Sequence, residues 1–225
     1  MKTRFILFAL ACFVLPACTP TAPTAAAETI RVQYTAAAIP WLADLNTCAG
    51  TTVVTSEQRA ADFLDPTSVD LALRIGQPKE LTSPAYQIST EDILVIVNSQ
   101  NPSKTLTAEE ERGLFEGTNH TWQAINGSDA PVQVWVFTAG EDVQQVFEQN
   151  AMGGSPITTL ARLATSPDEM SQAIANDVNA VGILTRHWKA GNVTEAFSVS
   201  TVPVLALVLA EPQGVVQEIL ACLQK

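Results

Sequence analysis

The chain has 225 residues, 47% of them apolar, and 12 basic side chains stand against 23 acidic ones, for a net charge of −11 at pH 7. This acidic balance argues against a nucleic-acid partner, because nucleic-acid binding depends on lysine and arginine at the phosphates. It also excludes a basic patch as the means of adhering to anionic lipid headgroups. The length suits one large core or two small lobes.

The first 17 residues have the layout of a secretory signal. A basic start is followed by a short apolar run over 5–14, which is too short to span a bilayer. The run ends at 15–18 (LPAC), which resembles the lipobox of exported bacterial lipoproteins. We therefore expect residues 1–17 to be removed and Cys18 to carry the lipid. The alternatives are an ordinary signal cleaved within 19–27 and an uncleaved anchor.

Residues 18–27 are rich in proline, threonine and alanine and carry no charge. Such a segment cannot bury enough apolar surface to repay the entropy of ordering, so we expect a lipidated, disordered tether. The mature chain would then be anchored to the extracytoplasmic face of the cell envelope membrane through its N-terminal lipid. The globular part of the chain after the tether would then lie in water, away from the membrane surface.

Four cysteines occur, and only two belong to the expected globular body. Cys12 leaves with the signal and Cys18 is the lipid site, so Cys48 and Cys222 remain as one even pair in a disulfide-permissive compartment. We expect them to bond; the alternative is two separate buried thiols. With two histidines and no Cys-x-x-Cys spacing, neither a metal site nor a cofactor is expected.

The first part of the body alternates strand and helix. We expect strands at 29–35, 51–55 and 69–75, and helices from Pro40 to Gly50 and over 57–64. This rhythm predicts a parallel sheet.

The second part carries clearer helix signals. Thr107 and Glu110 form a capping box that opens a helix ending at Gly117, and Ser166 with Pro167 opens another. Further elements are expected as strands at 93–97, 132–137, 180–185 and 202–209, a helix from about Glu141, and a C-terminal helix with Cys222 on its apolar face.

Several sequence segments together resemble those of the phosphate-type substrate-binding proteins of ABC transporters. The most specific are 91–98 (EDILVIVN), the Asn-Pro turn at 101–102, the capped helix and 114–122 (LFEGTNHTW), with 180–184 and 204–214 matching later parts. The resemblance implies an α/β, two-lobed, periplasmic-binding-protein-like (type II) fold, in which each lobe is a mostly parallel sheet flanked by helices. Residues 28–92 plus 199–225 would form lobe I and residues 93–198 lobe II. Both Cys48 and Cys222 would then lie in lobe I.

In open α/β sheets, ligands bind beyond the carboxyl ends of the strands. In lobe I this places Thr35, Ala36 and Ala37, Ser56, and Arg74 with Gly76 at the expected ligand site. Their small residues allow backbone N–H groups to point at an anion. Ordinary turn chemistry is the alternative for any single loop.

In lobe II the equivalent loop contains Thr138, Ala139, Gly140 and Glu141. The family carries Arg…Ser-Gly-Thr there, and only Thr138 and Gly140 match. Glu141 and the following Asp142 place negative charge beside an expected anion site, which puts phosphate in doubt. Alternatively, the two acids complement the dipole of their helix.

Two arginines end apolar strands, one in each expected lobe. Arg74 is the charged anchor if the ligand is anionic, with pairing to a surface carboxylate as the alternative; for Arg186 that pairing is the favoured interpretation.

The chain shows no nucleophile with a base, metal cluster or phosphate loop, so an enzyme is not expected. The leading hypothesis is an extracytoplasmic solute-binding lipoprotein, a monomer that captures a small ligand, anionic if Arg74 serves as anchor, between its lobes for an ABC-type permease. The alternative is a surface or sensory interaction module of the same fold with no transport role.

Overall fold

The computed structural model describes residues 28–62 and 69–225. The expected signal peptide, Cys18 and the tether lie outside this range, as do the last two residues of the helix expected over 57–64. No helix within the described residues is both long and apolar enough to cross a membrane.

The strands form one eight-stranded sheet in the order β2-β1-β3-β8-β4-β7-β5-β6. The strands are β1 Thr29–Tyr34, β2 Thr52–Glu57, β3 Leu71–Ile75, β4 Ala85–Asn98, β5 Gln133–Phe137, β6 Arg162–Ala164, β7 Ala180–Thr185 and β8 Val193–Leu207. Strand β1 pairs in parallel with β2 and β3, and β5 with β6 and β7. Antiparallel pairs join β3 to β8, β8 to β4 and β4 to β7. The two parallel sets expected from the sequence are therefore fused through the antiparallel strands in the middle.

Helices cover both faces of this sheet. They are α1 Leu42–Ala49, α2 Ala108–Glu116, α3 Asp142–Asn150, α4 Pro167–Asn176 and α5 Gly214–Leu223, with 3-10 turns η1 Ala36–Trp41, η2 Ala60–Asp62, η3 Trp122–Ile125 and η4 Arg186–Trp188. The expected capping box is present, because Glu110 N–H donates to Thr107 Oγ1 and Thr107 N–H donates to the Glu110 carboxylate. Ser166 accepts a hydrogen bond from Glu169 N–H at the start of α4, with Pro167 at the first helical position.

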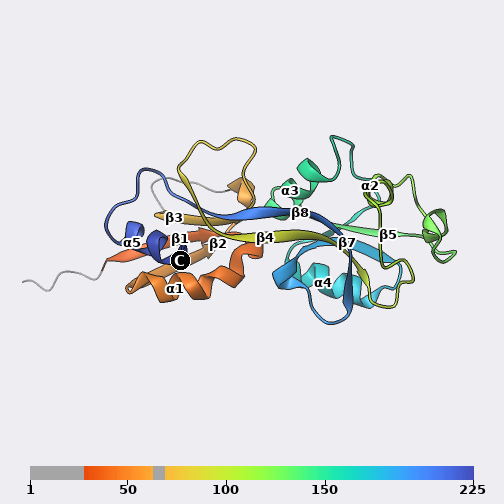
Figure 1. The fold of residues 1–225 in the computed structure, drawn as a ribbon, viewed down its shortest axis with the longest axis horizontal. Helices are drawn as coiled ribbons and strands as arrows, with labels where there is room; N and C mark the ends of the chain where they lie inside the picture. Colours follow the sequence, from red (N-terminus) through yellow and green to blue (C-terminus); the bar gives the residue numbers. More distant parts are fainter. Residues whose placement is uncertain (1–27, 63–68) are drawn as a thin grey trace, which may run out of the picture.

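The long strands β4 and β8 run side by side through the middle of the molecule (Figure 1). Strands β1 to β3 with α1 and α5 lie at one end, and β5, β7, α2 and α4 lie at the other. Residues 93–97 of β4 are completely buried, which fits their apolar sequence. Among the described residues, the chain passes between the two ends in β4 and returns in β8.

Three features differ from the sequence-based expectations. Residues 57–62 are not an α-helix: β2 continues to Glu57, and only the 3-10 turn η2 follows. Tertiary contacts override the helical pattern there, because Gln58 N–H donates to Tyr34 O and Ala61 N–H to Gly140 O. The last strand begins at Val193 rather than at 202, and the short edge strand β6 was not expected.

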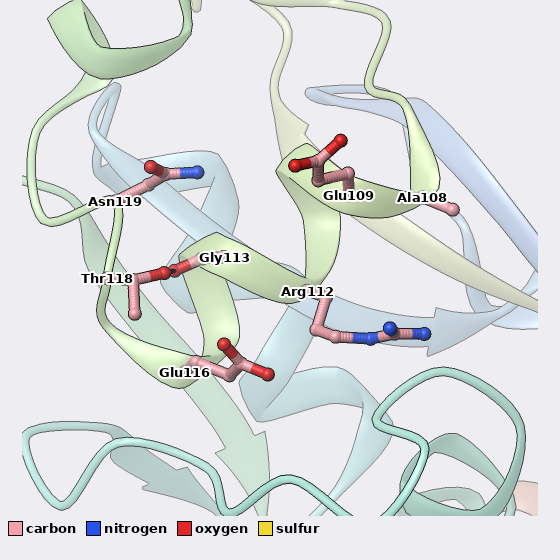
Figure 2. Close-up of a pocket in the computed structure, with 7 residues that line it drawn as sticks. All are labelled: Ala108, Glu109, Arg112, Gly113, Glu116, Thr118 and Asn119. Carbon is pink, nitrogen blue, oxygen red and sulfur yellow. Dashed lines mark hydrogen bonds between the residues drawn. The ribbon is translucent and has the colours of Figure 1, made fainter.

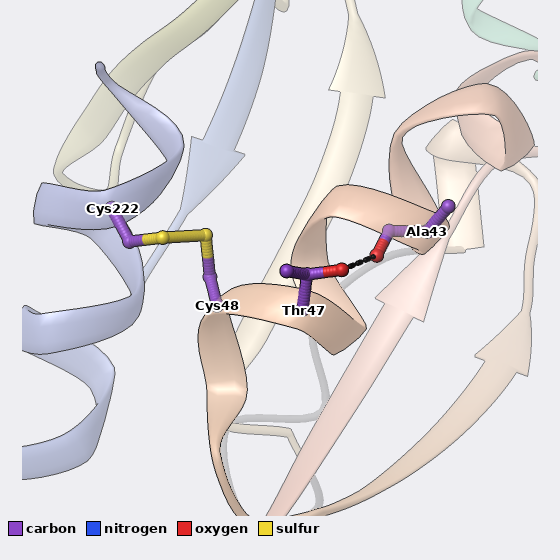
Figure 3. Close-up of a disulfide and its surroundings, with 4 residues drawn as sticks. All are labelled: Ala43, Thr47, Cys48 and Cys222. Atoms are coloured by element: carbon purple, nitrogen blue, oxygen red, sulfur yellow. Dashed lines mark hydrogen bonds between the residues drawn. A yellow bond between two sulfur atoms is a disulfide. The ribbon is translucent and has the colours of Figure 1, made fainter.

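A disulfide joins Cys48, near the end of α1, to Cys222 in α5 (Figure 3). The two Cα atoms lie 5.7 Å apart although 174 positions separate them in the chain. The expected pairing is therefore confirmed, and it fastens the first helix to the last at the same end of the sheet.

Candidate functional site

A cavity of about 350 Å³ lies where the strands of both ends of the sheet terminate; we call it the cleft cavity. Its lining residues all follow or end a strand: Ala36, Glu57, Gln58, Arg59, Asp62, Thr138, Glu141 and Thr165. The contributing strands are β1 and β2 at one end and β5 and β6 at the other. This is the position at which an α/β sheet of this topology offers a ligand site.

The charge in the cleft cavity is predominantly negative. Glu57, Asp62 and Glu141 contribute carboxylates, and Arg59 is the basic residue of the lining. Arg59 Nε already pairs with Asp62 Oδ2 at 2.7 Å, and its Nη1 donates to Ala139 O at 3.3 Å. The guanidinium is thus engaged by internal partners.

Glu141 is the buried acid of this cavity. It caps the N-terminus of α3 with only 8% of the residue exposed, and within the described part of the chain its side chain has no hydrogen-bond partner. Burial, then the neighbouring Asp142, raises its pKa to about 7; Arg59 opposes this effect, and Glu57 and Asp62 add to it. Glu141 is therefore partly protonated at neutral pH.

Asp142, the next residue, binds donors at the strand ends where the sequence predicted the anion site of lobe I. Its Oδ2 accepts hydrogen bonds from Thr35 Oγ1 at 2.6 Å and from Ile75 N–H at 2.7 Å, and its Oδ1 accepts one from Val143 N–H at 2.8 Å. Burial raises the pKa of this carboxyl, against the lowering effect of these donors. The space beside it measures about 10 Å³, too little for a bound oxyanion.

Arg74 is also engaged by internal partners. Its Nε donates to Gly76 O at 3.0 Å and its Nη2 to Gln145 Oε1 at 3.2 Å. Burial lowers its pKa, and Asp142 counteracts this effect. The side chain borders a separate cavity of about 140 Å³ with Glu80 and Ser83, not the cleft cavity.

The two ends of the sheet pack closely around this site at two glycines. Gly76 has φ +71°, and a Cβ there would overlap Val146 of α3. Gly140 has φ +95°, and a Cβ there would lie 2.9 Å from Ala61. Both positions combine a left-handed backbone with close approach across the cleft, so both require glycine.

A second set of contacts joins the turn η4 to β4 and to η1. His187 Nδ1 lies 2.6 Å from the buried Glu91 carboxylate, and Trp188 Nε1 donates to Ala37 O at 3.2 Å. Arg186 pairs with Asp92 at 2.7 Å and with Glu195 at 2.8 Å, as the favoured interpretation of this arginine predicted.

Of the ten expected site residues, three line the cleft cavity, and the others lie elsewhere around it. Ala36, Thr138 and Glu141 line the cleft cavity, while Ala37 borders the small space beside Asp142. Thr35 is fully buried on Asp142, and Gly76 packs on α3. Ser56 is exposed and its neighbour Glu57 lines the cavity instead; Ala139 contributes its carbonyl to Arg59.

Sequence reasoning missed Gln58, Arg59, Asp62 and Thr165. The first three fell within the wrongly expected helix, and Thr165 follows the unexpected strand β6. The Thr-Ser-Pro sequence at 165–167 was available as a signal, because a helix start after a strand marks a ligand-facing loop.

A larger hollow of about 600 Å³ lies along α2 and the loop after it (Figure 2). Its lining residues are Ala108, Glu109, Arg112, Gly113, Glu116, Thr118 and Asn119. One helix and its following loop supply all of them, so this hollow lacks the two-sided enclosure of the cleft cavity. Within the described ranges, no group of three or more His, Cys, Asp or Glu side chains is placed to hold a metal ion.

Comparison with known proteins supports the fold. Neither a protein-family profile nor a curated protein sequence matches the chain. Among solved structures, a candidate phosphate ABC transporter substrate-binding protein with bound phosphate from Clostridium perfringens superposes with a TM-score of 0.78 at 14% identity, over 87% of this chain and 92% of that one.

Two further solved structures have a similar fold. An ABC-type phosphate transport receptor from Vibrio cholerae gives a TM-score of 0.69 at 17% identity, over 87% of this chain and 93% of that one. The CcmR regulatory domain of Synechocystis PCC6803, in complex with 2-PG, gives 0.66 at 15% identity, over 87% and 95%. At these identities the likeness establishes the fold, so the resemblance to phosphate-type, type II periplasmic binding proteins is confirmed at that level.

Proposed function

We propose that this protein is an extracytoplasmic solute-binding lipoprotein that holds a small ligand between its lobes and delivers it to an ABC-type permease. The observation that carries the proposal is the cleft cavity, which is lined from both ends of the sheet at the strand termini. A ligand in that position contacts both lobes and stabilises their closed arrangement. A permease can then distinguish the loaded protein from the empty one.

The proposed lobes are residues 28–92 plus 199–225 and residues 93–198. The first boundary falls inside β4 and the second inside β8, the two strands that join the ends of the sheet. The register between these strands shifts between Ile93 and Leu94, next to the first boundary. Such an irregularity allows local bending, which supports a hinge at this level.

Anchoring and partners follow from the sequence. Cys18 is the proposed lipid site, no nucleic-acid partner is proposed, and the protein is proposed to act as a monomer at the outer face of the membrane. The first two structural relatives are described as phosphate transport proteins, and this supports transport over the sensory alternative. Co-purification of a membrane permease with the loaded protein would favour transport, whereas capture of a signalling protein would favour the alternative.

A thermal-shift screen with the exported full chain tests ligand binding. Anions, amino acids and amines are screened, and a ligand at 100 times its Kd should stabilise the fold by about 2.7 kcal/mol. Gln58→Trp fills the cleft cavity and should abolish the shift. Gln149→Trp makes the same substitution at an exposed position of α3 and should not.

The proposal fails if no compound shifts the wild-type melting temperature. It also fails if the shift persists in Gln58→Trp, since the ligand then binds elsewhere.

A further inference from the structure

We propose that the cleft cavity binds a small organic cation, an ammonium compound, with the Glu141 carboxylate as its charged anchor. This inference rests on the proposed solute-binding function and adds the chemical class of the ligand. It departs from phosphate, the ligand of the structure from Clostridium perfringens.

The donors that an anion would need are already engaged by internal partners. Thr35 Oγ1 and Ile75 N–H, the lobe I donors at the strand ends, already bind Asp142. Arg74 is turned to Gly76 and Gln145 and borders another cavity. Arg59, the cation that does line the cleft cavity, pairs with Asp62 at 2.7 Å.

Glu141 is a buried acid that lacks a hydrogen-bond partner within the described residues. Glu141 is 8% exposed and borders the cleft cavity, and within the described residues no donor reaches its side chain. Its carboxyl interacts electrostatically with Glu57, Arg59 and Asp62, which all line the same cavity, so the group faces that space. A buried carboxylate without a partner is unfavourable, and a bound cation supplies the missing charge and hydrogen bonds.

The volume and the lining residues of the cleft cavity favour a small organic cation. A volume of about 350 Å³ is near the lower end for small-molecule sites, so the ligand is small. The three carboxylates do not form a cluster that could hold a metal ion, which favours an organic cation. Thr138 and Thr165 border the cavity on the lobe II side; a hydroxyl oxygen accepts hydrogen bonds from an ammonium group, and that of Thr165 keeps this acceptor capacity while it donates to Glu169 at 2.7 Å.

Isothermal titration of the exported full chain with matched four-carbon probes tests the charge class. The probes are butane-1,4-diamine, n-butylamine, the neutral butane-1,4-diol and the dianion succinate, with inorganic phosphate as a further anion. At least one of the two amines should bind, while the diol, succinate and phosphate should bind at least tenfold more weakly. Glu141→Gln should weaken amine binding about ten- to a hundredfold. Glu109→Gln, at an exposed acid in the hollow along α2, should leave it unchanged.

A second readout separates an anchoring role from a structural one. Glu141 must be ionised to hold a cation, so amine affinity should rise as pH rises through about 7 and protons should be released on binding. The charged groups facing it are Glu57 at the end of β2, Arg59 and Asp62 near η2, and Asp142 on its own helix. Glu141→Gln should abolish the proton release, which is measured by titration in two buffers of different ionisation enthalpy.

Three results overturn the inference. Preferred binding of succinate or phosphate that Gln58→Trp blocks would show the wrong ligand class while leaving the solute-binding function intact. Amine binding that is unchanged in Glu141→Gln would remove Glu141 as the anchor. If no probe of any charge binds, and the wider thermal screen also finds nothing, the proposed function fails together with this inference.

Discussion

Replacing Asp142 by alanine removes the carboxylate that joins α3 to the strand ends of β1 and β3. In the wild-type protein this side chain is completely buried and accepts hydrogen bonds from Thr35 Oγ1, Ile75 N–H and Val143 N–H. Alanine leaves these donors without their acceptor. The Thr35 hydroxyl can rotate toward another acceptor, but the two backbone N–H groups are fixed.

The expected loss follows from those two groups. A buried donor left unsatisfied costs about 1–3 kcal/mol, which gives about 2–6 kcal/mol for the pair. Removing the carboxylate also removes the cost of its burial, the effect that raises its pKa. We therefore expect Asp142→Ala to lower the free energy of unfolding by about 2–4 kcal/mol.

Urea denaturation of the full chain followed by circular dichroism measures this loss. Asp44→Ala is the matched control, because Asp44 is also an acid in the first turn of a helix, α1, but is exposed. Its loss should stay below about 1 kcal/mol. Formate has the size of the deleted group and should recover about 1.4 kcal/mol in Asp142→Ala at ten times its Kd.

Two outcomes would refute this reasoning. A loss in Asp142→Ala no larger than that in Asp44→Ala would mean that the buried carboxylate contributes no more than an ordinary helix-end charge. Equal stabilisation of the wild type by formate would mean that the anion acts elsewhere than at the vacated position.

Three further predictions concern other parts of the chain. Glu111 is 1% exposed, its Oε1 has no hydrogen-bond partner among the described residues, and burial raises its pKa to about 7. Because the folded state then holds its proton more tightly than the unfolded state, the free energy of unfolding falls as pH rises from about 4.5 to about 7. Urea titrations should therefore show that Glu111→Gln raises the free energy of unfolding by about 1–3 kcal/mol at pH 8 and leaves it unchanged below about pH 4.5. Reducing the Cys48–Cys222 bond opens a loop with a sequence separation of 174 and should cost about 4–5 kcal/mol as an upper value, while thiol titration of the unfolded, non-reduced body should find no free thiol. Intact mass of the exported protein should show an acylated Cys18 at its N-terminus, lost in Cys18→Ala; a wild-type product that starts elsewhere would contradict the lipoprotein assignment.

Much of the fold is encoded in local patterns. The capping box at Thr107, the Ser166-Pro167 helix start and the apolar run 93–97 each specify their element, and the structure contains all three. The residues 57–62 were misread because Arg59, Ala60 and Ala61 suit a helix locally. Contacts with residues distant in the sequence fix their conformation, among them Ala61 N–H to Gly140 O and Gln58 N–H to Tyr34 O.

The site was only partly predictable, for a physical reason. An acid at a helix start has the same local signature whether it complements the dipole, lines a cavity or is buried. Glu141 and Asp142 are adjacent in sequence, yet Glu141 faces the cleft cavity and Asp142 binds Thr35, which is 107 positions away. This difference depends on long-range packing, which neither residue's local sequence encodes.

The place of β8 in the middle of the sheet has a consequence for the order in which the chain folds. Strand β3, whose five residues are all buried, pairs with residues 204–207 of β8, which follow much later in the sequence. During synthesis from the N-terminus, β1 to β3 therefore emerge long before this partner, and one apolar edge of β3 stays uncovered and prone to aggregation until then. By contrast, β4, β5, β6 and β7 pair with one another before β8 arrives. Because Cys222 lies in α5, which follows β8, the disulfide with Cys48 forms only after β8 has emerged, and it then stabilises the half of the sheet that is completed last.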